Sequence, residues 1–205
     1  VEHFGERDED DEDMLANANR EITLFGRDTK YDLHLSENKV HYGTAGAAVH
    51  MVDVESRLYR ESTVRDLHNA ARIVQHLDNI HFVQRPMVCR DILDNREMDL
   101  NTIYACTTGT KKHVGTSFTE PDFVDDAFEM LHMIAGGEEA WRKRPFVSNS
   151  NCFVVPPMKF ATESCQVMEK CIAGGMPILL LSAGQAGATA PAPIAGAIVQ
   201  AVAEC

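Results

Sequence analysis

Residues 178–205 read ILLLSAGQAGATAPAPIAGAIVQAVAEC and contain three local sequence patterns, one after another. The first four residues form an apolar run with the length of a buried strand. A loop of small residues follows. Pro191 and Pro193 then stand where a helix would begin, and apolar residues recur at helical spacing from residue 194 to residue 205. A strand, a glycine-rich loop and a helix start in this order let the backbone approach a ligand closely.

Earlier segments repeat this order of strand and helix. Strand candidates begin at His81, His113, Phe146 and Pro177, so successive starts lie 32, 33 and 31 residues apart, with a helical stretch in each interval. A near-constant period with one strand and one helix per unit predicts an α/β fold with a parallel βα array.

Two architectures satisfy this array, an open doubly wound sheet and a closed (β/α)8 barrel of the TIM type. A doubly wound sheet usually carries a G-x-G-x-x-G motif after a strand, and the sequence has none there. A closed barrel takes about 250 residues, and the roughly 145 residues after Arg60 supply about four units. Residues 61–205 therefore fit an incomplete βα barrel, about its first half.

The first 60 residues have a different pattern. Segments 21–26, 31–35, 39–42 and 49–54 alternate apolar and polar residues, which predicts a small antiparallel β-element over residues 21–60. Residues 6–13 (ERDEDDED) hold seven acids and one base, so residues 1–20 are expected to be a solvated, mobile acidic segment. Thr63 and Asp66 have the spacing of a capping box that starts the first helix after the β-element.

Charge and cysteine content exclude several classes of function. A net charge of −12 argues against nucleic acid or an anionic membrane as the main partner. No apolar run reaches the roughly 18–20 residues that a membrane span needs, and no signal peptide is visible. Six cysteines without close pairs or framework spacing favour a reduced, cytoplasmic compartment.

The polar residues expected to meet at one edge of the array follow its strands. In a parallel array the reactive groups sit on loops at the carboxyl ends of the strands, which selects residues 84–86, 117–119, 149–151 and 182–189. These loops contain no Ser-His-Asp set and no paired carboxylates, so no catalytic residue is assigned and a cofactor is expected to supply the difficult step. The candidate substrate-binding residues are Gln185, Arg85, Asn151, Asn149, Ser117, Phe118 and Thr189.

Each of these candidates also has a structural explanation. Arg85, the one cation on the loops, can grip a carboxylate, or instead hold loop backbone or pair with Asp91 or Asp94. Phe118 can wall a methylammonium group or pack in the core. The asparagines are hydrogen-bonding groups but also turn formers. Gln185 has small neighbours that leave it room to face a cavity, or the loop is glycine-rich only so that the next helix docks tightly.

A metal site is not predicted. The nine histidines include no pair at i, i+4 and none beside a cysteine.

Four segments in the same order resemble the trimethylamine methyltransferase family. They are the C-terminal stretch quoted above, GRDTKYDLHL at 26–35, YGTAGAAVHMVD at 42–53 and LDNIHFVQRP at 77–86. The resemblance runs from about Arg20 to the last residue. Family members are longer, so the resemblance implies a fragment that lacks the family's C-terminal part, and it favours the barrel over the open sheet.

The resemblance also implies an activity. Family members move a methyl group from a methylated amine to the Co(I) of a separate corrinoid protein, in methylamine metabolism and methanogenesis. It therefore implies that no cofactor is bound tightly by this chain and that the corrinoid comes with a partner protein. Pyrrolysine, which marks the trimethylamine-specific members, is absent here, and this favours a quaternary amine such as glycine betaine. A small-amine binding module, a TIM-barrel enzyme of another reaction class and a homo-oligomeric state stay open.

Overall fold

A four-stranded parallel sheet with strand order β10-β7-β6-β5 forms the centre of the computed structural model, which describes residues 9–36 and 38–204. The register places Gln84 beside Gly115 and Thr116 beside Asn149, so the carboxyl ends of the strands lie at one edge. The parallel array and the α/β class are thereby confirmed. The strands are β5 (Phe82–Gln84), β6 (His113–Thr116), β7 (Val147–Asn151) and β10 (Ile178–Leu180).

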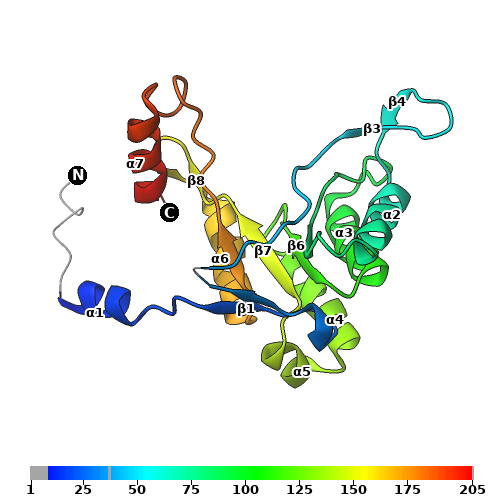
Figure 1. Ribbon diagram of the computed structural model, residues 1–205, viewed down its shortest axis with the longest axis horizontal. Coiled ribbons are helices and arrows are strands. Elements are labelled where there is room, and N and C mark those ends of the chain that lie inside the picture. Colours follow the sequence, from blue (N-terminus) through cyan, green and yellow to red (C-terminus); the bar gives the residue numbers. More distant parts are fainter. Residues whose placement is uncertain (1–8, 37, 205) are drawn as a thin grey trace.

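Helices alternate with these strands along the chain (Figure 1), and the main hydrophobic core is formed by side chains of both. Leu67, Ile103, Leu131 and Trp141 are fully buried and pack with Val83, Val114 and Val147 of the sheet. Burial of such apolar side chains is the dominant favourable term in folding. The helices after the β-rich region are α2 (Val64–Gln75), α3 (Asn95–Gly109), α4 (Phe123–Ala135), α5 (Glu138–Lys143), α6 (Thr162–Ala173) and α7 (Ile194–Glu204).

The predicted antiparallel element is two separate hairpins. One joins β1 (Ile22–Leu24) to β2 (Leu33–Leu35) through the 3₁₀ turn Thr29–Tyr31, and the other joins β3 (His50–Val52) to β4 (Tyr59–Glu61). His113 fastens the first hairpin to the sheet, because its Nδ1 lies 2.8 Å from the Phe25 carbonyl and its Nε2 lies 3.0 Å from Ser148 Oγ.

The expected strand at 39–42 is wrong. The chain there leads instead into residues 43–48, which run parallel to β5 and the residues that follow it, through bridges from Gly43 to Phe82 and from Ala48 to Met87. Gly43 permits this approach, since the Phe82 ring fills the space that a Cβ would need. Backbone groups of residues 81–88, at this edge of the sheet, thus find hydrogen-bond partners in residues 42–48.

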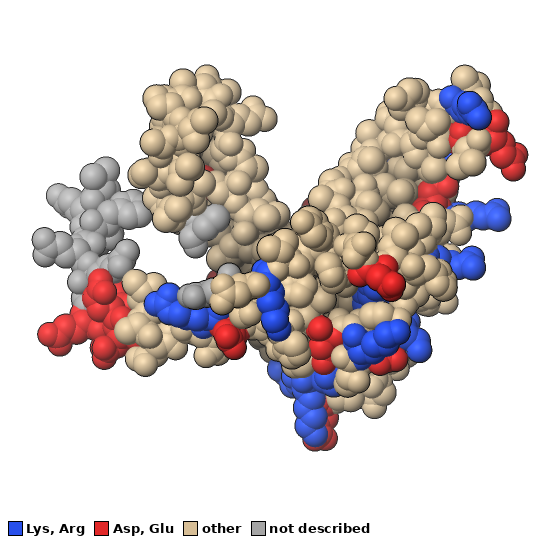
Figure 2. Space-filling model, in the orientation of Figure 1, with Lys and Arg blue, Asp and Glu red and all other residues tan. Residues whose placement is uncertain are grey.

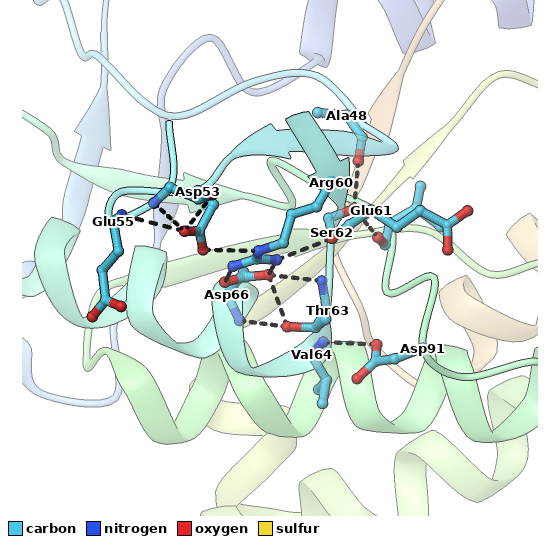
Figure 3. A network of polar contacts seen from close by, with 12 residues as sticks. Ala48, Asp53, Glu55, Arg60, Glu61, Ser62, Thr63, Val64, Asp66 and Asp91 are labelled. Atoms are coloured by element: carbon cyan, nitrogen blue, oxygen red, sulfur yellow. Dashed lines mark hydrogen bonds and ion pairs between the residues drawn. The ribbon is translucent and has the colours of Figure 1, made fainter. Parts of the chain in front are cut away.

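The predicted capping box at the start of α2 is confirmed and is part of a larger network (Figure 3). Thr63 N–H donates to Asp66 Oδ2 at 2.9 Å, and Asp66 N–H donates to Thr63 Oγ1 at 3.3 Å. Arg60 grips the same carboxylate at 2.6 and 2.9 Å and also donates to Asp53 at 3.1 Å. The Arg60 hydrogen bonds lower the pKa of Asp66 to about 2. This network attaches the β3–β4 hairpin to α2.

Two arms rise on either side of the carboxyl edge of the sheet (Figure 1). One arm is the β3–β4 hairpin. The other holds α7 and the hairpin of β8 (Val154–Val155) and β9 (Lys159–Phe160), a pair that the sequence patterns did not predict. Figure 2 shows a notch between the arms whose walls carry few charged side chains. Glu204 ties the second arm together, accepting from Ser182 Oγ at 2.6 Å and from Met158 N–H at 3.1 Å.

The ends of the chain add little to the core. Helix α1 (Glu9–Asn17) lies within the predicted acidic segment and is exposed throughout, while residues 1–8 and Cys205 lie outside the described residues. The mobility of residues 1–20, the three-part division of the chain and closure of the sheet into a barrel stay predictions. In the described part of the chain, no helix is long and apolar enough to cross a membrane.

Candidate functional site

A hollow of about 340 Å³ lies at the carboxyl edge of the parallel sheet. It is bounded by the ends of β5, β6 and β7, the first turns of α6, and single residues from the 43–48 segment and from the end of β10. This is the edge at which parallel sheets bind ligands. The lining residues are Gly46, Gln84, Arg85, Ser117, Phe118, Asn149, Ser150, Asn151, Cys152, Ser164, Val167 and Leu181.

Five of the seven predicted substrate-binding residues line this one hollow. They come from three different strand–loop junctions, and the parallel register brings them together. The five residues are Arg85, Ser117, Phe118, Asn149 and Asn151.

Asn149 and Asn151 carry amide groups that the protein leaves partly unsatisfied. Asn149 is 1% exposed, and neither its Oδ1 nor its Nδ2 has a hydrogen-bond partner among the described residues. Asn151 donates from Nδ2 to the Ser164 carbonyl at 2.9 Å, while its buried Oδ1 has no partner there. Buried polar atoms are almost always paired, and an unpaired one costs about 1–3 kcal/mol. The hollow therefore offers both a donor and acceptors to an occupant.

Arg85 brings a positive charge to the hollow without a matching ion pair. Its guanidinium has no hydrogen bond and no salt bridge within residues 9–36 and 38–204. The two aspartates that were alternative partners are engaged elsewhere. Asp91 accepts from Val64 N–H at 2.9 Å, and Asp94 caps α3 by accepting from Glu97 N–H at 2.9 Å. A half-buried cation with free donors is suited to a carboxylate ligand.

Ser117 and Phe118 are held by a contact behind the hollow. The next residue, Thr119, donates from its backbone nitrogen at 2.8 Å and from Oγ1 at 2.9 Å to Asp99 Oδ2. Asp99 is 1% exposed, and burial raises its pKa, while Thr119 and the Arg85 charge oppose that rise. The loop that forms this wall is thus fixed to α3.

Gln185 and Thr189, the other two predicted residues, do not line the hollow. They close an exposed turn on each other, with Gln185 N–H donating to Thr189 Oγ1 at 2.9 Å. The Gln185 carbonyl accepts from the three backbone N–H groups of residues 188–190. Gln200 of α7 then donates to the Thr189 carbonyl at 2.9 Å. A role for either residue in substrate binding stays a prediction.

Several lining residues are not predicted by the sequence patterns, and in each case the tertiary structure gives the reason. Gln84 and Ser150 lie within the loops at the strand ends, but only the register between the strands makes them neighbours. Gly46 enters because residues 43–48 pair with β5. Ser164 and Val167 come from a helix, outside the strand-end rule.

The described residues contain no group of side chains suited to hold a metal ion. In residues 9–36 and 38–204, no three His, Cys, Asp or Glu side chains are grouped to hold a metal ion. Cys152 in the hollow is free, as are Cys89, Cys106, Cys165 and Cys171.

The fold and the hollow define an α/β protein with a small, sparsely charged candidate site at the carboxyl edge of its parallel sheet. A comparison with models of known protein families gives a match over nearly the whole chain. The family model described as trimethylamine methyltransferase (MTTB) matches residues 8–205, and the chain therefore belongs to that family.

Known relatives agree with this assignment. Trimethylamine methyltransferase MttB of Desulfitobacterium hafniense (strain DSM 10664 / DCB-2) is 29% identical over 194 residues, covering 92% of this chain and 38% of that protein. MttB1 of Methanosarcina mazei is 29% identical over 189 residues, covering 90% and 38%. The glycine betaine methyltransferase of Desulfitobacterium hafniense (strain Y51) is 21% identical over 188 residues, covering 91% and 39%. The chain thus spans less than two fifths of the length of these relatives.

Proposed function

We propose that this chain is part of a methyltransferase that transfers a methyl group from a methylated amine to the Co(I) of a separate corrinoid protein. The hollow at the sheet edge is then the amine site. The observation that carries this assignment is Asn149, which is buried in the lining with both amide atoms unpaired. Family membership supplies the reaction class.

The chain's own residues have a limited task in this reaction. The Co(I) centre of the partner supplies the nucleophile, so the protein has to bind the amine, orient one N-methyl group and keep water away. In the proposed transfer the carbon–nitrogen bond breaks, the methyl carbon bonds to cobalt, and the nitrogen keeps the electron pair. A lining of amides, hydroxyls and one aromatic ring, with a single cation, fits this positioning role.

Glycine betaine is the proposed substrate in preference to trimethylamine. A betaine combines a quaternary nitrogen with a carboxylate, and the unpaired Arg85 guanidinium provides a bidentate partner for that carboxylate. Phe118, which follows the neighbouring strand β6 and also lines the hollow, provides a ring face for the methylated cation. Sequence identity is higher to relatives named as trimethylamine methyltransferases, so both amines belong in the test.

The remaining proposals concern the complete protein. We propose that the parallel sheet is half of a (β/α)8 barrel, that the corrinoid is held by the partner and not by this chain, and that the partner reaches the amine through the notch between the two arms (Figure 2). A cytoplasmic location is proposed from the cysteine content.

The experiment is a binding titration followed by a transfer assay. Calorimetric titration of the protein with glycine betaine and with trimethylamine measures binding, with Arg85→Met as the variant. We expect Arg85→Met to weaken glycine betaine at least about tenfold, because a hydrogen-bonded ion pair is lost, and to leave trimethylamine little changed. Transfer is followed by the absorbance change from Co(I) to methylcobalamin. Binding without transfer would identify an amine-binding module, and no binding of either amine would refute the proposed site.

A further inference from the structure

Gln84 is fixed across the face of the sheet by contacts with two other segments. It is the last residue of β5, and its carbonyl accepts from Thr44 Oγ1 at 2.5 Å. Its side-chain Oε1 accepts from Ser150 Oγ at 3.1 Å. Ser150 belongs to β7, and β6 lies between the two strands. The amide of Gln84 therefore passes over β6 to reach its partner.

Gly115 makes that path available. The parallel register places Gly115 directly beside Gln84. A Cβ on residue 115 would lie 2.8 Å from Gln84 Cδ and closer still to Oε1, so any other residue would displace the amide. The glycine is needed here for space over β6, and the amide of Gln84 occupies that space.

The fixed orientation leaves one end of the amide free. Ser150 satisfies Oε1, so the two hydrogens of Nε2 are the unused groups, and they have no hydrogen-bond partner in the part of the chain that the structure describes. Gln84 lines the same hollow as Arg85 and Asn149. Three side chains there thus combine unused N–H donors with one positive charge, a set that is complementary to an anionic oxygen group.

We propose that Gln84 determines substrate specificity by donating from Nε2 to the carboxylate of a methylated amino acid, in an orientation set by Ser150 and Gly115. This inference rests on the proposed function and deepens it. According to this inference, both Gln84, which is uncharged, and Arg85 make the site prefer an amine that carries a carboxylate.

Replacement of the amide by a carboxylate tests the donor role. Gln84→Glu keeps the length of the side chain and replaces a donor by a negative charge. Gln166→Glu makes the same chemical change at an exposed position of α6, one residue before the hollow-lining Val167, and is the matched control. Titrations use glycine betaine and tetramethylammonium, a quaternary amine that lacks a carboxylate. We expect Gln84→Glu to weaken glycine betaine at least about tenfold and tetramethylammonium by less than about twofold, and Gln166→Glu to change neither.

Two further variants move the amide without changing its chemistry. Gly115→Ala displaces the Gln84 side chain, and Ser150→Ala releases Oε1. We expect Gly115→Ala to reproduce the selective loss of glycine betaine binding, and Ser150→Ala to give a smaller selective loss of about threefold, the worth of one neutral hydrogen bond. Thermal unfolding followed by circular dichroism shows whether each variant is folded.

The possible results separate this inference from the proposed function. If the wild-type protein binds glycine betaine and Gln84→Glu binds it equally well, the role of Gln84 is refuted and the amine site stands. If Gln84→Glu weakens both ligands alike, its role is structural and the specificity inference is refuted. If the wild-type protein binds neither ligand, the proposed function fails, and the inference fails with it.

Discussion

Asp99 of α3 accepts two hydrogen bonds from Thr119, from the backbone nitrogen at 2.8 Å and from Oγ1 at 2.9 Å. This contact joins a buried position of α3 to the loop that carries Ser117 and Phe118 into the hollow. The other carboxylate oxygen of Asp99, Oδ1, has no hydrogen-bond partner among the described residues. The wall of the hollow therefore depends on a buried carboxyl group that is not itself part of the lining.

Removal of that carboxyl group should loosen the wall. Asp99→Ala leaves the Thr119 donors without an acceptor, and we expect the free energy of unfolding to fall by about 1–3 kcal/mol. Asp99→Asn keeps one acceptor oxygen and removes the buried charge, so we expect a loss of less than about 1 kcal/mol. Urea denaturation measures both. Equal losses in the two variants would show that the charge, and not the acceptor, holds the loop.

Asn149 should show a trade-off between stability and binding. Asn149→Leu replaces two unpaired buried polar atoms by apolar groups of similar size, so we expect the ligand-free protein to become more stable by about 1 kcal/mol and to lose amine binding. Denaturation midpoints and calorimetric titration measure the two effects. Asn101→Leu, at an exposed position of α3, is the control and should leave binding intact. A less stable variant that still binds would contradict the assigned role of Asn149.

His113 should make the protein less stable as the solution becomes acidic. Burial lowers the pKa of His113 to about 4, from an unfolded value of 6.5. Between these two pKa values the unfolded chain binds a proton at this histidine that the folded protein excludes. The contribution of His113 to the free energy of unfolding is therefore fully present above pH 6.5 and decreases as the pH falls toward 4. From pH 7 to pH 5 we expect the His113 contribution to decrease by about 2 kcal/mol.

His113→Gln isolates this contribution. Urea denaturation at pH 7 and pH 5 should show a smaller loss in the variant than in the wild type, by about 2 kcal/mol. His76→Gln, at an exposed position after α2, should keep the wild-type dependence. An identical pH dependence for wild type and His113→Gln would rule out His113 as its source.

Arg60 should anchor the β3–β4 hairpin locally and add little to global stability. Its side chain is 38% exposed, so we expect Arg60→Met to leave the urea midpoint of global unfolding nearly unchanged. The hairpin itself should detach from α2 (Figure 3), which loosens the backbone around the already exposed Arg57 and speeds its cleavage by trypsin. Limited digestion with mass spectrometry measures cleavage there. Arg90→Met removes only a 3.6 Å exposed pair with Glu61 and should leave the cleavage rate unchanged.

Much of the fold followed from patterns that act over a few residues. The strand starts near 81, 113, 146 and 177 were predicted, as were the capping box at Thr63 and Asp66 and the helix after Pro193. Hydrophobic periodicity and helix caps are local, so they can be recognised without knowing the tertiary contacts. The pairing of residues 43–48 with β5 is not local, and the expected antiparallel strand at 39–42 was wrong for that reason.

The candidate site, like the fold, was predicted only in part. Arg85, Ser117, Phe118, Asn149 and Asn151 were identified because the carboxyl ends of parallel strands must share one edge. The relation among Gln84, Gly115 and Ser150 was invisible, because it depends on the register of three strands whose sequence positions are far apart.

Local sequence patterns thus sufficed for the class of fold and for the edge of the sheet at which a ligand would bind. The arrangement of the hollow required the tertiary structure. Register decided which side chains face each other, burial decided which amides lack partners, and Asp91 and Asp94 accept backbone N–H groups at the starts of α2 and α3 and do not pair with Arg85. Each of these depends on contacts between segments distant in the chain, so no short window of sequence encodes them.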